Sequence, residues 1–157
     1  MVSYVAAIMK RSHAAQFNIQ SVHDLARQST VKYGVGDSGA IKDFFRTSTL
    51  PPYERMWSEM MLDPDANFVH TTAEGVERVL ASTDDRPWAF LADSLTLDYA
   101  ASQRSDLRVV LEPYSYRFLS LAVPFGSIYI DRLNIVILEL FETGEMNRLR
   151  MKWWNPE

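Results

Sequence analysis

The sequence of 157 residues contains no cysteine, which excludes a structural disulfide and a zinc site built on thiolates. It also lacks any run of about 18 or more apolar residues, the length that a membrane-spanning helix requires. The net charge is −4, and basic residues are scattered among acidic ones. Binding of a polyanion calls for a basic patch or stripe, so the composition argues against nucleic acid as a partner.

Recognisable motifs for catalysis and metal binding are missing as well. The histidines His13, His23 and His70 are far apart in sequence and show no HExxH spacing, which favours surface or capping roles for them. There is no GxSxG motif, and "GVGDSG" (34–39) lacks both the GK[ST] ending of a P-loop and the complete GxGxxG pattern. We therefore expect a protein that is not an enzyme and that needs neither a cofactor nor a metal.

Short β-type runs alternate with segments of helical periodicity, which is typical of an α/β layer structure. The run "WAFLAD" (88–93) is almost continuously apolar, as expected for a strand buried on both faces. Residues 51–62 carry an apolar stripe at helical spacing, which predicts a helix facing the core. The stripe comprises Tyr53, Met56, Trp57, Met60 and Met61. Further strands are predicted at 30–35, 67–70, 107–112 and 118–124, and further helices at 21–27, 40–48, 71–82, 94–103, 127–144 and 145–154.

The stretch "GDSGAIKDFF" (36–45) joins a strand to a helix that is expected to begin near Ala40. Amide groups at a helix start lack intrahelical partners, and together with the helix dipole they favour a carboxylate or a phosphate. In α/β sheets, ligands bind at this strand-to-helix edge. The alternative is a plain turn, in which Asp37 or Ser38 caps the helix and nothing binds.

Asp93 ends the apolar strand and directly precedes another helix. Its carboxylate is either the N-cap of helix 94–102 or an acceptor for a cationic group of a ligand. The local sequence favours the cap, because aspartate is among the preferred N-cap residues.

The order of several segments resembles the second ligand-binding segment of ionotropic glutamate receptors, over roughly residues 20–154. The motifs that carry this resemblance are "YGVGDSGAIKDFF" (33–45), "TTAEGV" (71–76), "WAFLADSLTLDY" (88–99) and "KWW" (152–154). This resemblance implies the periplasmic-binding-protein-like fold, in which two α/β lobes close around an amino acid. In the receptors, this closure opens a cation channel. Residues 1–19 would be the remnant of a membrane-helix linker, 20–126 the second lobe, and 127–157 the C-terminal helices that pack on a missing first lobe.

The resemblance also implies a ligand site. The positions of Ala40 and Ile41 hold ligand carboxylates, and members that bind glutamate commonly carry a hydroxyl at the latter. Ile41 has no donor, and an aspartate at Asp93 beside an apolar residue at 41 is similar to subunits that bind glycine or D-serine, with Asp93 pairing with the ligand's α-amino group. Thr72 matches a residue that reaches toward the first lobe. The complete set of expected ligand contacts is Ser38, Gly39, Ala40, Ile41, Thr72 and Asp93.

Two positions depart from the family pattern. Ser105 stands where the family usually has a cysteine, and Leu119 replaces a tyrosine; both departures are compatible with a divergent subunit, including the chemosensory receptors of invertebrates. We therefore expect part of a ligand-gated channel that binds a small amino acid or related compound, assembles with other subunits as a tetramer, and lies outside the cell in a plasma-membrane parent protein. The alternative is a solute-binding lobe without a channel, or an assembly subunit that binds no ligand.

Overall fold

The computed structural model describes the backbone of residues 2–154, and side chains at 3–111 and 119–154. These residues divide into two compact units, Val2–Arg117 and a C-terminal unit that begins at Phe118. Residue 1 of the expected linker and residues 155–157 of the expected C-terminal segment lie outside the described residues.

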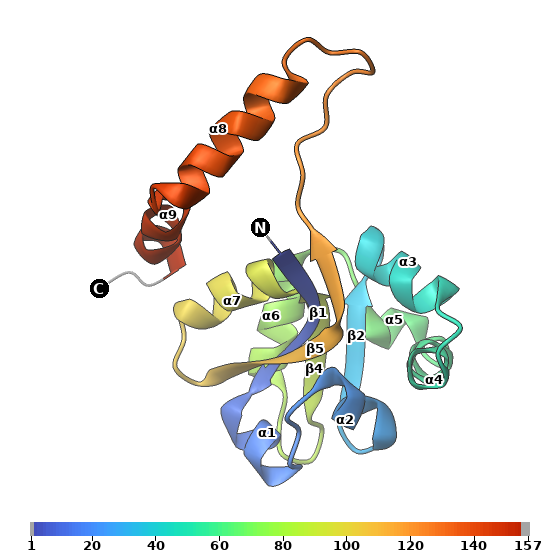
Figure 1. Ribbon diagram of the computed structural model, residues 1–157. Coiled ribbons are helices and arrows are strands. Elements are labelled where there is room, and N and C mark those ends of the chain that lie inside the picture. The colour runs from blue at the N-terminus through green and yellow to red at the C-terminus, as the bar shows by residue number, and fades with distance from the viewer. Residues whose placement is uncertain (1, 155–157) are drawn as a thin grey trace. The chain divides into compact units, whose positions relative to one another are not determined.

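The first unit is built on a mixed five-stranded sheet with the strand order β3-β2-β4-β1-β5 (Figure 1). Strand β2 pairs in parallel with both β3 and β4, whereas β1 runs antiparallel to β4. The predicted α/β class with a central mixed sheet is therefore confirmed. The strands are β1 (Val2–Lys10), β2 (Lys32–Gly36), β3 (Phe68–Val69), β4 (Trp88–Asp93) and β5 (Leu107–Phe118).

Helices flank this sheet on both faces, because alternate residues of the central strands enter two separate cores. In β4, Ala89 and Leu91 join one core, while Trp88 and Phe90 join the other. The first core also holds residues of α1 to α4, and the second holds residues of α6 and α7. The helices of this unit are α1 (Arg11–Gln16), α2 (Val22–Arg27), α3 (Ala40–Thr47), α4 (Pro51–Met60), α5 (Pro64–Asn67), α6 (Thr72–Ala81) and α7 (Ser94–Ser102).

No strand is predicted from the sequence at residues 2–10, which fall in the segment expected to be the remnant of a membrane-helix linker. Val2–Lys10 is a strand inside the sheet, and its residues from Val5 to Met9 are fully buried. A run of consecutive apolar residues suits a strand that is covered on both faces, which explains why this segment fits between β4 and β5. The origin of this segment in a membrane-helix linker, and the division at residue 126, stay predictions.

Other differences concern single positions and one strand. The strand expected at 118–124 is absent, since β5 ends at Phe118 and 119–124 has no regular structure. Met61 lies just beyond α4 and is 48% exposed, so it does not belong to the buried stripe of that helix. His13 is not a surface residue: it is a buried residue of α1, and its Nε2 lies 3.0 Å from Oδ1 of Asp84.

The C-terminal unit contains the helices α8 (Ile130–Glu142) and α9 (Glu145–Trp154). Gly144 follows the C-cap of α8 with a φ of 74°, the left-handed conformation in which a glycine commonly ends a helix. No residue of α8 is buried, although the helix carries several large apolar side chains. Within residues 2–154, no helix combines the length and the apolar character needed to cross a membrane.

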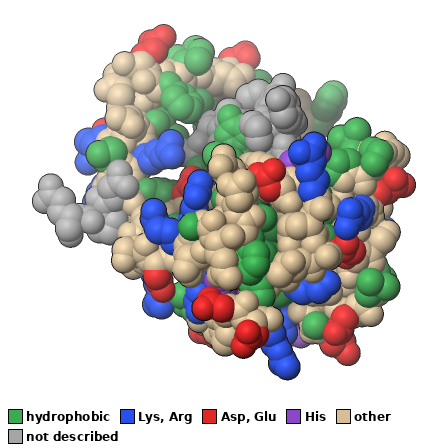
Figure 2. Space-filling model, turned by 90° about the horizontal axis from the view of Figure 1, so that it is seen from below, with side chains coloured by type: hydrophobic (Ala, Val, Ile, Leu, Met, Phe, Trp, Pro, Cys, Tyr) green, Lys and Arg blue, Asp and Glu red, His purple; other side chains and the backbone are tan. Residues whose placement is uncertain are grey.

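The face that Figure 2 shows carries Lys and Arg side chains as well as Asp and Glu side chains. The argument against a polyanion partner stays a prediction from the sequence.

A close backbone approach in the sheet yields a stability prediction. A Cβ at Gly34 would lie 2.1 Å from the backbone oxygen of Asn67, whereas a Cβ at Gly36 would meet Ser38 O at an ordinary 3.5 Å. We expect Gly34→Ala to lower the free energy of unfolding by about 1–3 kcal/mol or more, because the neighbour is backbone and cannot rotate away. Gly36→Ala, the control, should change it by less than about 1 kcal/mol. Urea unfolding measures both, and equal effects would contradict the packing argument.

Candidate functional site

A cavity of about 230 Å³ lies where β2 and β4 end and where α3 and α6 begin. Because β2 and β4 are parallel neighbours, their carboxyl ends meet at one edge of the sheet, which is where α/β proteins bind ligands. Of the expected ligand contacts, all except Gly39 line this cavity. The lining residues are Gly36, Asp37, Ser38, Ala40, Ile41, His70, Thr71, Thr72, Phe90, Leu91, Ala92 and Asp93.

Gly39 shapes the turn instead of lining the cavity. It is the N-cap residue of α3 with a φ of 92°, a left-handed conformation that glycine adopts without steric cost. No side chain caps this helix, so the capping role expected of Asp37 or Ser38 is wrong, whereas binding or absence of binding at this turn stays a prediction. The first amide groups of a helix lack intrahelical partners, and this makes the start of α3 a candidate for an anion.

Asp93 is the N-cap of α7, which was one of the two roles predicted for it from the sequence. Its Oδ1 accepts a hydrogen bond from the amide of Thr96 at 3.0 Å, and its Oδ2 accepts one from the Thr96 hydroxyl at 2.7 Å. The side chain is only partly buried and also lines the cavity. Because a carboxylate offers about four lone-pair sites, capping leaves acceptor capacity for a ligand ammonium.

An ion pair that was not predicted from the sequence lies at the rim of the cavity. Nδ1 of His70, which follows β3, lies 2.5 Å from Oδ2 of Asp37, which follows β2. The hydrogen bond to Asp37 is the main reason that the pKa of His70 is raised, and the charges of Asp37 and Glu74 add to it. The same hydrogen bond holds the pKa of Asp37 below its usual value.

The signal that could have revealed this pair is the parallel alignment of β2 with β3. Their register pairs Gly36 with Val69, which places the following residues, Asp37 and His70, side by side. The amide of Asp37 also donates to the carbonyl of Val69 at 2.8 Å and fixes this end of the ladder. Two short strands of uncertain register did not allow that alignment to be deduced from the sequence.

The wall of the cavity combines acids with apolar groups. Asp37 and Asp93 are the acids, His70 is the titratable base, and none of the described lining residues is Lys or Arg. Ile41 is partly buried and packs against the first core, which also holds residues of α1 to α4. A ligand with one ammonium group suits these acids, whereas a second carboxylate beside Ile41 would find no donor on that side chain.

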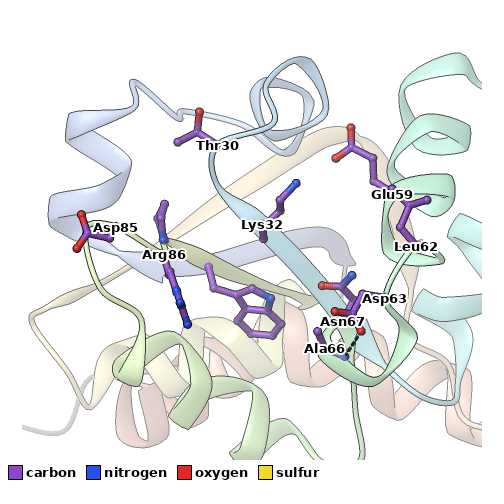
Figure 3. A pocket seen from close by; sticks show the side chains of 11 residues that line it. Thr30, Lys32, Glu59, Leu62, Asp63, Ala66, Asn67, Asp85 and Arg86 are labelled. Carbon is purple, nitrogen blue, oxygen red and sulfur yellow. Dashed lines mark hydrogen bonds between the residues drawn. The ribbon is translucent and has the colours of Figure 1, made fainter.

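A second cavity, of about 440 Å³, lies near the amino ends of β2 and β4. Figure 3 shows Lys32 extending from β2 and Glu59 from α4 along its wall. Two of its acids are already used: Glu59 accepts from Tyr33 and Arg55, and Asp63 caps α5 through the amide of Ala66. None of the expected ligand contacts lines this cavity, so the first cavity is the candidate site.

Among the described residues, no group of three or more His, Asp or Glu side chains could hold a metal ion.

Comparison with known proteins identifies relatives in sequence and in structure. Human and rat glutamate receptor 3 are each 37% identical to this chain over 137 residues, which is 87% of this chain and 15% of the relative. The structure is similar to that of the Drosophila muscle GluRIIB complex with glutamate, with a TM-score of 0.82 and 28% identity. That match covers 99% of this chain and 59% of the other chain. No family model matches the sequence.

Asp93 both caps α7 and lines the cavity, and its capping role yields a second stability prediction. Asp93→Ala should lower the free energy of unfolding by about 0.5–2 kcal/mol, because it removes the cap of α7. Asp93→Asn should retain most of that stability, since asparagine caps as well as aspartate does. Chemical denaturation followed by circular dichroism tests both, and an Asp93→Ala variant as stable as the unchanged protein would show that the cap contributes nothing.

Proposed function

Because the chain is a segment of the ligand-binding domain of an ionotropic glutamate receptor, we propose that it is the second lobe of a clamp for a small amino acid or related compound other than glutamate. The observation that carries this proposal is the shared cavity of Asp93, Ile41 and the uncapped start of α3. The chain spans only 15% of the length of the glutamate receptors that it matches, so the properties of the whole receptor are proposals too.

In the proposed complex, the ligand ammonium lies against Asp93 and the α-carboxylate accepts from amides at the start of α3. Ser38, Gly39 and Ala40 form the turn that presents those amides, and Thr72 lies at the start of α6 on the same cavity. At position 41 this chain has an apolar isoleucine, where family members that bind glutamate commonly have a hydroxyl residue. A short ligand such as glycine or D-serine fits this arrangement better than one with a distal carboxylate, which would be buried without a donor.

The proposed mechanism is closure of the clamp. A ligand that binds the closed state more tightly than the open state shifts the population toward closure, and closure strains the connections to the pore of a cation channel. The parent receptor would lie in the plasma membrane with this segment outside the cell, and its partners would be the first lobe of the same receptor and other subunits of a tetramer.

A second candidate is an assembly subunit that binds no ligand, or a solute-binding lobe without a channel. The helix α8 fits this candidate, since its large apolar side chains can pack against another subunit as well as against the first lobe. Membrane helices on both sides of this segment in the parent gene would support the channel and contradict the solute-binding lobe.

The ligand preference is tested in the ligand-binding domain formed by this chain together with the first lobe of its receptor. Calorimetric titration should give tighter binding for glycine or D-serine than for glutamate. Ile41→Thr should strengthen glutamate binding about tenfold or more, because a hydroxyl that donates to a carboxylate contributes about 1.5–3 kcal/mol. Glycine serves as the control, since it has no distal group and its affinity should change little.

Asp93→Asn tests the ammonium contact in the same domain. This change keeps the α7 cap but removes the charge, so amino-acid affinity should fall at least about tenfold while the fold is retained. Unchanged affinity would limit Asp93 to its capping role. Glutamate binding that is tighter than glycine binding in the unchanged domain would contradict the role given to Ile41.

A further inference from the structure

The Asp37–His70 pair lies on the same cavity as Asp93, but on the side where the turn into α3 presents its amides. The side chain of His70 is 84% exposed and that of Asp37 is 36% exposed, so the imidazole can exchange its proton with solvent. The charge of this rim therefore depends on pH.

The proton on His70 decides which ligand charges the rim favours. With His70 protonated, the pair is neutral overall and Asp93 is the single uncompensated acid of the cavity. With His70 neutral, Asp37 adds a second negative charge beside the α3 amides, where the carboxylate of an amino acid would lie. A second negative charge repels that carboxylate and attracts a cation.

We propose that the Asp37–His70 pair is a specificity-determining element of the ligand site: protonated, it favours zwitterionic amino acids, and deprotonated, it favours amines without a carboxylate. This inference rests on the proposed function and adds to it the class of ligand and its dependence on protons. Its basis is the 2.5 Å contact at the rim of the cavity and the lack of Lys and Arg among the described lining residues.

Three other charged groups lie near the pair. Glu74 of α6 accepts from the backbone amide of His70 at 2.9 Å and favours the protonated ring. Lys42 of α3 donates to the backbone oxygen of Asp37 at 2.7 Å, and Asp93 faces the cavity from the end of β4. The pair is complete above the lowered pKa of Asp37 and is lost as the pH rises through the raised pKa of His70.

The experiment compares glycine with methylamine, which differ by the carboxylate and both keep an ammonium group over about pH 5–8. Calorimetry on the ligand-binding domain, formed as above, should give a glycine-to-methylamine affinity ratio that falls about three- to tenfold as the pH rises through the titration of His70. The matched variants are His70→Gln, which fixes a neutral side chain, and His70→Lys, which fixes a cationic one.

The affinity ratios of the two variants should equal the two limits between which the ratio of the unchanged protein varies with pH. His70→Gln should hold the ratio at its high-pH value and His70→Lys at its low-pH value, both without a step in pH. NMR titration of the imidazole in this chain alone should give a lower pKa for His70 when Asp37 is replaced by Asn. A ratio that is flat with pH in the unchanged domain, or a step that persists in His70→Gln, would overturn the inference while leaving the clamp intact. Absence of binding by both ligands at every pH would overturn the proposed function and this inference together.

Discussion

The parallel pairing of β2 with β4 is the constraint on which the candidate site depends. Because the two strands run in the same direction, their carboxyl ends lie at the same end of the sheet. The turn into α3 and the N-cap of α7 therefore line the same cavity. The pairing is held by burial on both faces of β4, whose alternate side chains enter two separate cores. Loss of either core would disturb the alignment of the two strands and, with it, the spacing of the ligand contacts.

Much of the fold could be predicted from local pattern. The apolar run at 88–93, the proline start of α4 and the glycine that ends α8 each have a local physical cause, and the structure agrees with them. The gathering of Ser38, Ala40, Ile41, Thr72 and Asp93 around one cavity was accessible only through resemblance to a receptor family, because nothing in the spacing of these residues specifies which strands are neighbours. Their roles in binding remain proposals.

The errors have a common cause in contacts between residues that are distant in sequence. Val2–Lys10 reads locally as an apolar terminal segment, and only its register against β4 makes it a strand. His13 is buried, and its ring lies 3.0 Å from a carboxylate oxygen of Asp84, which stands 71 positions later in the sequence. The pairing of Asp37 with His70 follows from the register of β2 on β3, which a strand as short as Phe68–Val69 cannot specify by its own sequence.

The double engagement of Asp93 restricts how this lobe can diversify. One carboxylate caps the start of α7 through both of its oxygens and also lines the candidate cavity, so a substitution at position 93 alters the cavity and the helix cap together. Under the proposed function, ligand preference can therefore change more freely at Ile41 and at the rim than at position 93, where the residue must remain one that caps a helix. New ligand preferences on this scaffold should consequently arise around a short polar side chain at that position.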